Sequence, residues 1–204
     1  MITPAHPFYL IRHGETDWNR EQRFQGRTDI PLNEKGRGQA SAYSTLLLAE
    51  GHDWTRWHFV SSPLIRARHT MELLRDALGL DPKAYDVEDA LIEVTFGDWE
   101  RQTLTELRRK EPELMAAREA DKWNFVPPNG ESYDQARGRT RFVLESLPGP
   151  TVVVSHGGVI RAARYGLEAL DPKIAADTKI PQDDIYAWRD GRGGWLRDTT
   201  TGGF

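Results

Sequence analysis

Short apolar runs alternate along the chain with longer amphipathic stretches. The apolar runs predict buried strands at 8–11, 58–60 and 151–154, and a short edge strand at 85–87. Helical spacing and capping residues predict helices over 33–50, 64–78, 104–109, 112–122, 131–147 and 159–170. A closing hairpin is predicted from strands 184–188 and 195–198, joined across the glycine-rich segment 191–194.

The alternation of strands and helices sets the expected fold class. It favours helices on both faces of one sheet, so we predict an α/β fold, a three-layer α/β/α sandwich with a mostly parallel central sheet. The sequence shows no internal repeat or linker, and residues 1–204 are predicted to form a single domain. The piece from about 103 to 130, broken by Pro112, is predicted to be a small helical flap. The segment 91–99 is predicted to be a loop beside the site.

Composition narrows the classes of function. The 204 residues are 38% hydrophobic and 28% charged, an ordinary mix for a protein with a sizeable core. The net charge is −4, whereas a general nucleic-acid binder would be basic overall. The absence of cysteine excludes disulfides, thiolate metal sites and a cysteine nucleophile. No signal-peptide pattern and no apolar stretch of ~20 residues is present, so a cytoplasmic protein without a membrane partner is predicted.

Two of the predicted strands end in the same way. The first leads into Arg12 and His13, and the strand at 151–154 leads into His156 and Gly157. Ligands of open α/β sheets bind beyond the carboxyl ends of the strands, so parallel neighbours would bring both histidines to one rim. Arg66, in the helix after the second strand, is expected at the same rim.

Two histidines and two arginines on one rim would form a local cationic site in an acidic protein. A phosphoryl dianion is the natural occupant, because guanidinium groups match its oxygens. A neutral imidazole can attack phosphorus and form a covalent intermediate. The leaving oxygen then needs a proton donor. Glu93, flanked by apolar residues, is the candidate, and the nearby Asp98 and Glu100 are alternatives.

Five blocks of the sequence resemble, in order, the motifs of the histidine phosphatase superfamily, which includes the phosphoglycerate mutases. They are RHGETDWNREQRFQGRTDIPL (12–32), SSPLIRARHT (61–70), LIEVTFGDWE (91–100), PNGES (128–132) and VVVSHGG (152–158). The first three letters alone would be a weak signal, but five blocks in the family's order argue against chance.

The resemblance implies a role for each matching residue. His13 would be the nucleophile and phosphohistidine carrier, and Glu93 the general acid and then the base that activates water. The phosphoryl group would be bound by Arg12, Arg66 and His156. Asn19 would assist, and Gln25 and Gly26 would line the substrate side, where Gly157 also lets the backbone approach a ligand. No metal and no cofactor is expected.

The expected reaction is hydrolysis of a small phosphorylated metabolite. The stretch before the PNGES block is shorter than the insertion usual in the mutases, which favours transfer to water. A phosphoglycerate mutase-type phosphotransferase is the main alternative, and a non-catalytic phospho-ligand binder is a third. Arg101 stands where the phosphatase branch usually has glycine, and His69 and Met71 where Gln and Ala are common, so the substrate stays open. Arg101 would suit a substrate with a second acidic group, or would be solvated.

Two other hydrolase classes fit poorly. A serine hydrolase using Ser155 would need glycine where Val153 stands. A binuclear metallophosphatase would need a His/Asp cluster that the sequence lacks. Exposed sheet edges would allow a homodimer, and the tail 199–204 is expected either to be disordered or to fold over the site.

Overall fold

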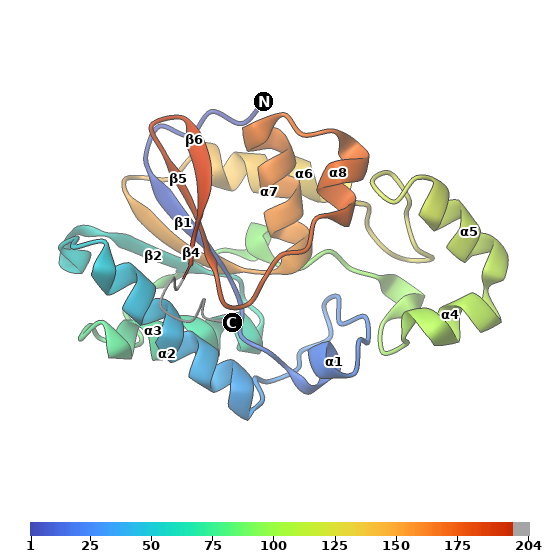
Figure 1. Ribbon diagram of the computed structural model, residues 1–204, viewed down its shortest axis with the longest axis horizontal. Coiled ribbons are helices and arrows are strands. Elements are labelled where there is room, and N and C mark those ends of the chain that lie inside the picture. Colours follow the sequence, from blue (N-terminus) through green and yellow to red (C-terminus); the bar gives the residue numbers. More distant parts are fainter. Residues whose placement is uncertain (198–204) are drawn as a thin grey trace, which may run out of the picture.

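The structure is a computed structural model that describes residues 1–197, so the predicted behaviour of the tail 199–204 lies outside it (Figure 1). Its centre is a six-stranded sheet in the order β3-β2-β4-β1-β5-β6. The strands are β1 (Phe8–Arg12), β2 (His58–Ser61), β3 (Asp86–Val87), β4 (Thr151–Ser155), β5 (Ile185–Arg189) and β6 (Arg192–Leu196). The first four are parallel, and β5 and β6 add an antiparallel edge. The predicted α/β fold with a mostly parallel sheet is confirmed.

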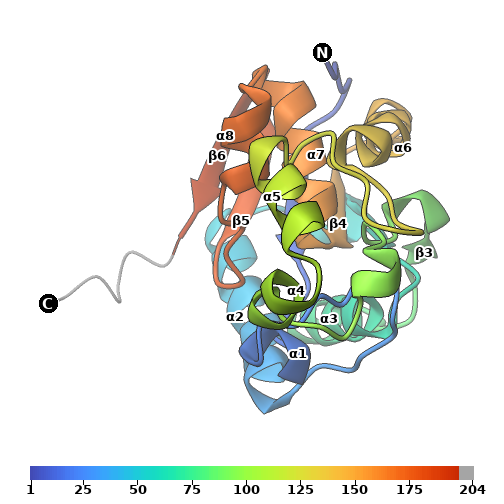
Figure 2. The ribbon, with the colours of Figure 1, turned by 90° about the vertical axis from the view of Figure 1, so that its right-hand side faces the viewer.

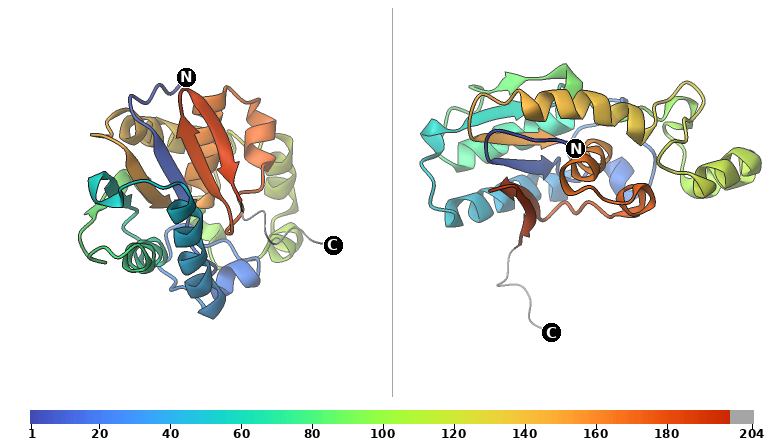
Figure 3. Two further views of the ribbon diagram at one scale, coloured as in Figure 1. Left: turned by 60° about the vertical axis from the view of Figure 1, so that its left-hand side comes forward. Right: turned by 90° about the horizontal axis from the view of Figure 1, so that it is seen from above.

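Helices cover both faces of the sheet, as the views in Figure 3 show. The helices are α1 (Asp17–Arg20), α2 (Glu34–Ala49), α3 (Ile65–Ala77), α4 (Leu104–Lys110), α5 (Pro112–Ala120), α6 (Tyr133–Glu145), α7 (Gly157–Glu168) and α8 (Pro172–Asp177). Helices α2 and α3 pack together on one face, and α6 and α7 on the other. Short 3-10 turns occur at Trp54–Arg56, Asp89–Leu91 and Gly97–Trp99.

Alternation along the central strands builds two hydrophobic cores. In β1, Phe8 and Leu10 face the core under α6 and α7, whereas Tyr9 and Ile11 face the core under α2 and α3. Successive side chains of a strand point to opposite faces, so a continuous apolar run is what a doubly covered strand requires. Each fully buried large apolar side chain contributes roughly 1.5–3 kcal/mol. The two central strands that carry the candidate histidines are therefore held firmly from both sides.

Several predicted boundaries differ from the structure. Helix α7 begins at Gly157, two residues earlier than predicted, because His156 is already its N-cap. Strand β6 includes Gly193 and Gly194, which the sequence had suggested as part of the turn; the turn falls instead at Asp190 and Gly191, both with positive φ. Helices α1 and α8 were not predicted. Both are short and depend on capping by Thr16 and Asp171 rather than on an apolar stripe.

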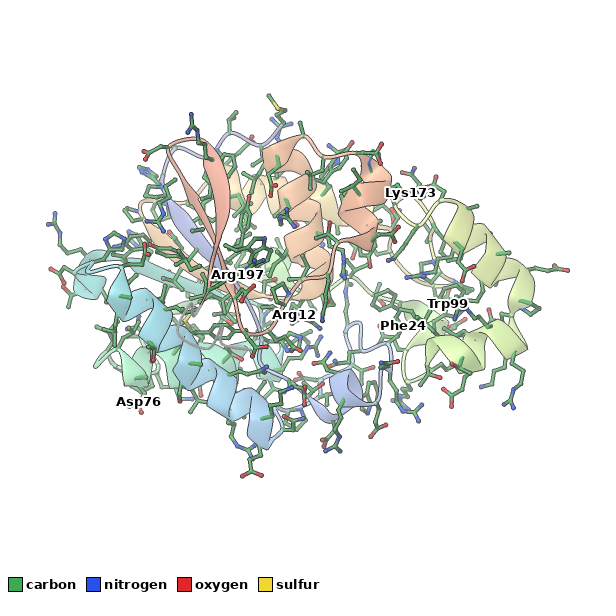
Figure 4. All side chains as sticks on the ribbon, in the orientation of Figure 1. Arg12, Phe24, Asp76, Trp99, Lys173 and Arg197 are labelled. Atoms are coloured by element: carbon green, nitrogen blue, oxygen red, sulfur yellow. The ribbon has the colours of Figure 1, made fainter. Side chains whose placement is uncertain are left out.

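The predicted flap is formed by α4 and α5, which lie to one side of the sandwich in Figure 1 and in front of it in Figure 2. Its own small core contains Trp99, Leu107 and Met115, with Phe24 packed against them. The labelled side chains in Figure 4 place Phe24 and Trp99 at the base of the flap and Arg12 at the end of β1. The flap is thus anchored to the 24–28 loop and to the segment that follows Glu93.

Candidate active site

The pairing of β1 with β4 brings the two candidate histidines together. The strands are parallel and in register, with Arg12 opposite Ser155, so His13 and His156 occupy equivalent positions just past the strand ends. The backbone N–H of His13 donates to the Ser155 carbonyl (2.9 Å). The two imidazole rings lie with centroids 5.1 Å apart, and both are buried. The rim expected from the sequence is therefore formed by these two strands.

His13 is held in one tautomer by its own backbone. Its Nδ1 lies 2.7 Å from the Gly14 carbonyl oxygen, which can only accept, so Nδ1 carries the proton and Nε2 has a free lone pair. Burial lowers the pKa of His13 well below its usual value, and the neighbouring Arg66 and Arg12 lower it further. At neutral pH the side chain is an uncharged imidazole, the form that can act as a nucleophile.

His156 is oriented by Ser62, at the end of β2. His156 Nε2 lies 2.6 Å from Ser62 Oγ, which also accepts weakly from the Leu64 N–H (3.4 Å). Burial, and then Arg66 and His13, lower the pKa of His156 well below its usual value, so it too is neutral. With the Ser62 hydroxyl as donor to Nε2, the proton of His156 lies on Nδ1. That buried Nδ1 has no hydrogen-bond partner within residues 1–197.

Arg12 and Arg66 are both anchored through their terminal nitrogens to backbone carbonyls. Arg12 Nη1 donates to Ile180 (2.7 Å), while Arg66 donates from Nη1 to Thr28 (2.8 Å) and from Nη2 to Gly26 (2.7 Å). Burial, and then nearby Arg161, lowers the pKa of Arg12 to about 10, and burial lowers the pKa of Arg66. The buried Nε of each arginine has no partner in the described part of the chain. These N–H groups are buried, unpaired hydrogen-bond donors, which are rare in folded proteins.

Glu93 reaches the same site from the loop after β3. Its Oε1 accepts from the backbone N–H groups of Val94 (2.9 Å) and Gly158 (3.1 Å), at the start of α7. A Cβ on Gly158 would lie 2.6 Å from Glu93 Oε1, so glycine is needed for this close approach. Glu93 is partly exposed and close enough to Arg12 and Arg66 to interact with their charges. It is therefore positioned between the cationic pocket and solvent.

The substrate-side candidates are placed less uniformly. Asn19 completes the capping box of α1, whose N-cap is Thr16; its Oδ1 accepts from the Thr16 N–H and, at 3.3 Å, from Gln182 Nε2. Gln25 is buried, and its Oε1 has no partner among the described residues. The backbone of Gly26 holds Arg66, and Gly157 lies beside the Arg12 guanidinium. Gly26 thus supports the pocket from behind, whereas Gln25 offers a free polar atom.

Three residues near the site were missed by sequence reasoning. Gln182 donates to the His13 carbonyl (2.8 Å) as well as to Asn19. Arg161, one turn into α7, adds a third guanidinium beside Arg12 and Gly157. Ser62 orients His156. Arg161 follows Gly157 by four residues, so on a helix that starts at Gly157 the two lie on the same face, and this spacing was a signal in the sequence. Gln182 lies 169 residues from His13 and gave none.

Other charged candidates are exposed or already paired. Asp98 is exposed and accepts from Asn129 Nδ2, and Glu100 is occupied by several donors of the 27–28 and 95–96 segments. Arg101 is exposed. Arg108 forms an exposed ion pair with Glu119, so the basic run 108–110 does not face the pocket through this residue. Ser155 Oγ donates to the Leu91 carbonyl (2.8 Å), which holds the loop that carries Glu93.

Two negative findings apply to residues 1–197. No group of three or more His, Asp or Glu side chains is arranged to hold a metal ion. No helix in this part of the chain has the length and apolarity needed to traverse a bilayer.

Comparison with known proteins identifies the family. The model of the histidine phosphatase superfamily (branch 1) matches residues 8–198. The chain belongs to this superfamily. It is 35% identical to an adenosylcobalamin/alpha-ribazole phosphatase of Salmonella typhimurium over 157 residues, 74% of each chain. It is 33% identical to a 2,3-bisphosphoglycerate-dependent phosphoglycerate mutase of Afipia carboxidovorans over 171 residues, 80% of this chain and 82% of the relative.

Solved structures agree with the fold. A mycobacterial glucosyl-3-phosphoglycerate phosphatase superposes with a TM-score of 0.76 at 28% identity, covering 89% of each chain. Some curated relatives are longer: a bifunctional protein of Mycobacterium tuberculosis is 37% identical over 152 residues, which span 72% of this chain but 40% of that protein. The relatives include both phosphatases and phosphoglycerate mutases. Membership of the superfamily therefore makes an enzyme of one of these types the expectation, but it does not say which reaction this chain catalyses.

Proposed function

We propose that this protein hydrolyses a small phosphomonoester through a phosphohistidine on His13. The observation that carries the proposal is a neutral imidazole with a free Nε2, surrounded by three buried nitrogens that lack partners within residues 1–197. These are Arg12 Nε, Arg66 Nε and His156 Nδ1. Buried donors are nearly always paired in folded proteins, so three around one nucleophile indicate a site for an acceptor-rich anion. A phosphoryl group supplies the required oxygens and charge.

In the first step, His13 Nε2 attacks phosphorus and an N–P bond forms as the ester O–P bond breaks. The electron pair stays with the leaving oxygen, which takes a proton from Glu93. The donors of Arg12, Arg66 and His156 stabilise the charge on the equatorial oxygens. The N–H groups of Val94 and Gly158 hold the Glu93 carboxyl group in place for this transfer.

In the second step, a water molecule attacks the phosphohistidine and gives its proton to Glu93. The N–P bond breaks, its electron pair returns to Nε2, and inorganic phosphate leaves. The carboxylate form of Glu93, held by Val94 and Gly158, suits this role as general base. Glu93 thereby regains the proton that it gave to the leaving oxygen, and the remaining O–H of the water leaves as part of the phosphate.

The most direct experiment is a phosphate-release screen over a panel of phosphorylated metabolites with EDTA present. Wild-type protein and His13→Ala are run side by side, and p-nitrophenyl phosphate serves as an activated reference. We expect metal-independent release by the wild type and none above background by the variant. Equal turnover by the two proteins would show that His13 is not the nucleophile.

We also propose a cytoplasmic location, which the cysteine-free sequence supports.

A phosphoglycerate mutase-type phosphotransferase is the second candidate, and one observation favours it. Arg161 and Arg118 extend the cationic surface from Arg12 toward the flap, with Tyr133 beside both. Burial lowers the pKa of Arg118, nearby Arg161 lowers it further, and no ion pair of Arg118 occurs in the described residues. Such cations would bind a second acidic group. Isomerisation of 3-phosphoglycerate that is much faster than phosphate release would favour the mutase.

A further inference from the structure

Glu100 is a half-buried carboxylate on which five donors converge. Oε1 accepts from the N–H groups of Arg27 (3.0 Å) and Phe96 (3.3 Å) and from the Thr95 hydroxyl (3.0 Å). Oε2 accepts from both the N–H (3.1 Å) and the hydroxyl (2.6 Å) of Thr28. A carboxylate offers about four lone-pair positions, so these donors saturate it. Glu100 is therefore unsuited to donate a proton, and the structure argues against it as an alternative acid.

The charge state of Glu100 agrees with this saturation. Burial alone would raise its pKa, but the hydrogen bonds from Thr28, Arg27 and Thr95 outweigh burial and hold the pKa below the usual value. The group is thus an ionised acceptor at neutral pH. Its contacts join two segments that are about 70 residues apart in sequence, a separation of 73 for Arg27 and 72 for Thr28.

The first of these segments, residues 26–28, binds the Arg66 side chain. The Arg66 guanidinium donates to the carbonyls of Gly26 and Thr28. Between these two carbonyls lie the N–H groups of Arg27 and Thr28, which donate to Glu100. Once both carbonyls are fixed, the guanidinium plane is fixed, and its Nε is left without a partner among residues 1–197. The position of Arg66 Nε therefore depends on the 26–28 loop, which Glu100 holds in place.

Gly26 shows how tightly the loop is drawn onto the carboxylate. Its φ is +50°, and a Cβ at this position would lie 1.9 Å from Glu100 Oε1. Only glycine permits both the backbone conformation and this approach. The second segment, containing Thr95 and Phe96, follows Glu93 directly, and Arg27 Nε contacts the Glu93 carbonyl at 3.4 Å. One carboxylate thus links the segments that carry the phosphoryl-binding arginine and the candidate acid.

We infer that Glu100 is a positioning residue, which sets the Arg66 guanidinium for the phosphoryl group through the carbonyls of Gly26 and Thr28. The inference rests on the proposed function, since it assumes that Arg66 binds the phosphoryl group. Glu100 itself touches no reacting atom in this scheme. Its loss would weaken binding of a phosphoryl dianion rather than remove the nucleophile.

The test is a double-mutant cycle between Glu100→Gln and Arg66→Lys. The amide replaces one acceptor oxygen by a donor and cannot accept from all five groups, and lysine cannot bond both carbonyls and still present a side-chain nitrogen as arginine does. Two quantities are measured, the inhibition constant of inorganic phosphate and kcat/KM for p-nitrophenyl phosphate. With Arg66 present, Glu100→Gln should weaken phosphate binding about ten-fold; in the Arg66→Lys background it should have less than about two-fold effect.

A matched control is Asp98→Asn, which changes a neighbouring carboxylate whose hydrogen bonds within residues 1–197 come from Asn129 alone. It should leave phosphate binding unchanged. Equal effects of Glu100→Gln in both backgrounds would indicate a general structural role and overturn the inference, as would an unchanged phosphate constant in Glu100→Gln alone. A wild-type protein that fails to bind phosphate, or an Arg66→Lys variant that binds it normally, would overturn the proposed function as well.

Should Glu100→Gln fold poorly, Thr28→Val provides a milder version. It removes only the shortest of the five contacts, the Thr28 hydroxyl at 2.6 Å, and keeps the carbonyl that holds Arg66. We expect a smaller loss of phosphate affinity, about three-fold, that also disappears in the Arg66→Lys background. A loss that persists there would count against the inference.

Discussion

Similar side chains lie at the two ends of the central sheet. At one end they bind one another, whereas at the other some of their buried nitrogens have no partner within residues 1–197. At the end away from the site, the Tyr9 hydroxyl donates to Glu50 (2.8 Å) and lies 3.0 Å from His52 Nε2, while Arg189 forms an ion pair with Glu50 (2.6 Å). The phenol, the carboxylate, the imidazole and the guanidinium all find partners there. This cluster can be understood from stability alone.

At the carboxyl end, the imidazoles and guanidinium groups are left incomplete. His13 and His156 are buried and neutral, and Arg12 and Arg66 contact backbone carbonyls rather than carboxylates. Each unsatisfied buried donor costs about 1–3 kcal/mol. The difference shows that residue type alone does not identify a candidate site: the same groups stabilise the fold where they pair with one another, and those left unpaired within residues 1–197 are the candidates for ligand binding.

The largest expected contrast is between the histidines. His13→Ala should lower kcat/KM for p-nitrophenyl phosphate by about 10⁴-fold or more, because the covalent route is lost. His52→Ala at the other end should change it less than two-fold. Steady-state kinetics on both variants checks the contrast, and a His13 variant that keeps a tenth of the wild-type rate would break it.

The same substitution at two arginines sharpens the comparison. Arg66→Lys should lower kcat/KM about 100-fold, since lysine cannot hold both carbonyls and also present a donor to the phosphoryl oxygens. Arg189→Lys should leave kcat/KM unchanged and lower the free energy of unfolding by no more than about 0.5 kcal/mol, because this ion pair is partly exposed. Kinetics and urea unfolding of both variants would decide; equal kinetic losses would contradict the account.

Acid should destabilise the site end first. The pKa of both buried histidines lies below the usual value, so below about pH 6.5 the unfolded chain binds protons that the folded protein does not. The contribution is present above pH 6.5 and is lost as pH falls toward the folded-state values. The free energy of unfolding should decrease by up to about 1.4 kcal/mol per pH unit for each histidine. Urea unfolding that gives the same value at about pH 7.5 and pH 5.5 would show that these groups are not buried neutral.

Ser62 gives a smaller effect within the site. Ser62→Ala removes the partner of His156 Nε2, and the ring can then turn or take the other tautomer. We expect kcat/KM to fall about ten-fold, with partial rescue in Ser62→Thr. Nitrogen-15 NMR of His156 should show the proton on Nδ1 in the wild type and a mixture in the alanine variant. A wild-type ring protonated on Nε2 would contradict the assignment.

The smallest effect belongs to the paired cluster. Tyr9→Phe leaves Glu50 with its Arg189 partner and should cost about 1 kcal/mol of unfolding free energy without changing kcat/KM. Thermal or urea unfolding measures the first quantity. A change in kcat/KM of more than two-fold would mean that the two ends of the sheet are coupled.

Much of the candidate site could be predicted because two of its residues directly follow predicted strands. His13 and His156 follow apolar runs that predict buried strands, and the two histidines meet because the structure makes these strands parallel neighbours. Gln182, Ser62 and Glu100 could not be assigned in this way. Their roles depend on contacts such as His13 with Gln182 and His156 with Ser62, between segments up to 169 residues apart, which no local pattern specifies. The short helices α1 and α8 were missed for a related reason, since capping rather than amphipathicity defines them.

The central claim is that His13 Nε2 takes the phosphoryl group covalently. The direct measurement is rapid acid-free quenching during turnover of p-nitrophenyl phosphate, followed by peptide mass spectrometry and phosphorus NMR of the trapped protein. We predict one acid-labile phosphoryl group on Nε2 of His13 and none in His13→Ala. A phosphoryl group on Ser155 or His156, or turnover with no phosphoenzyme in a protein whose His13→Ala variant remains active, would contradict the account.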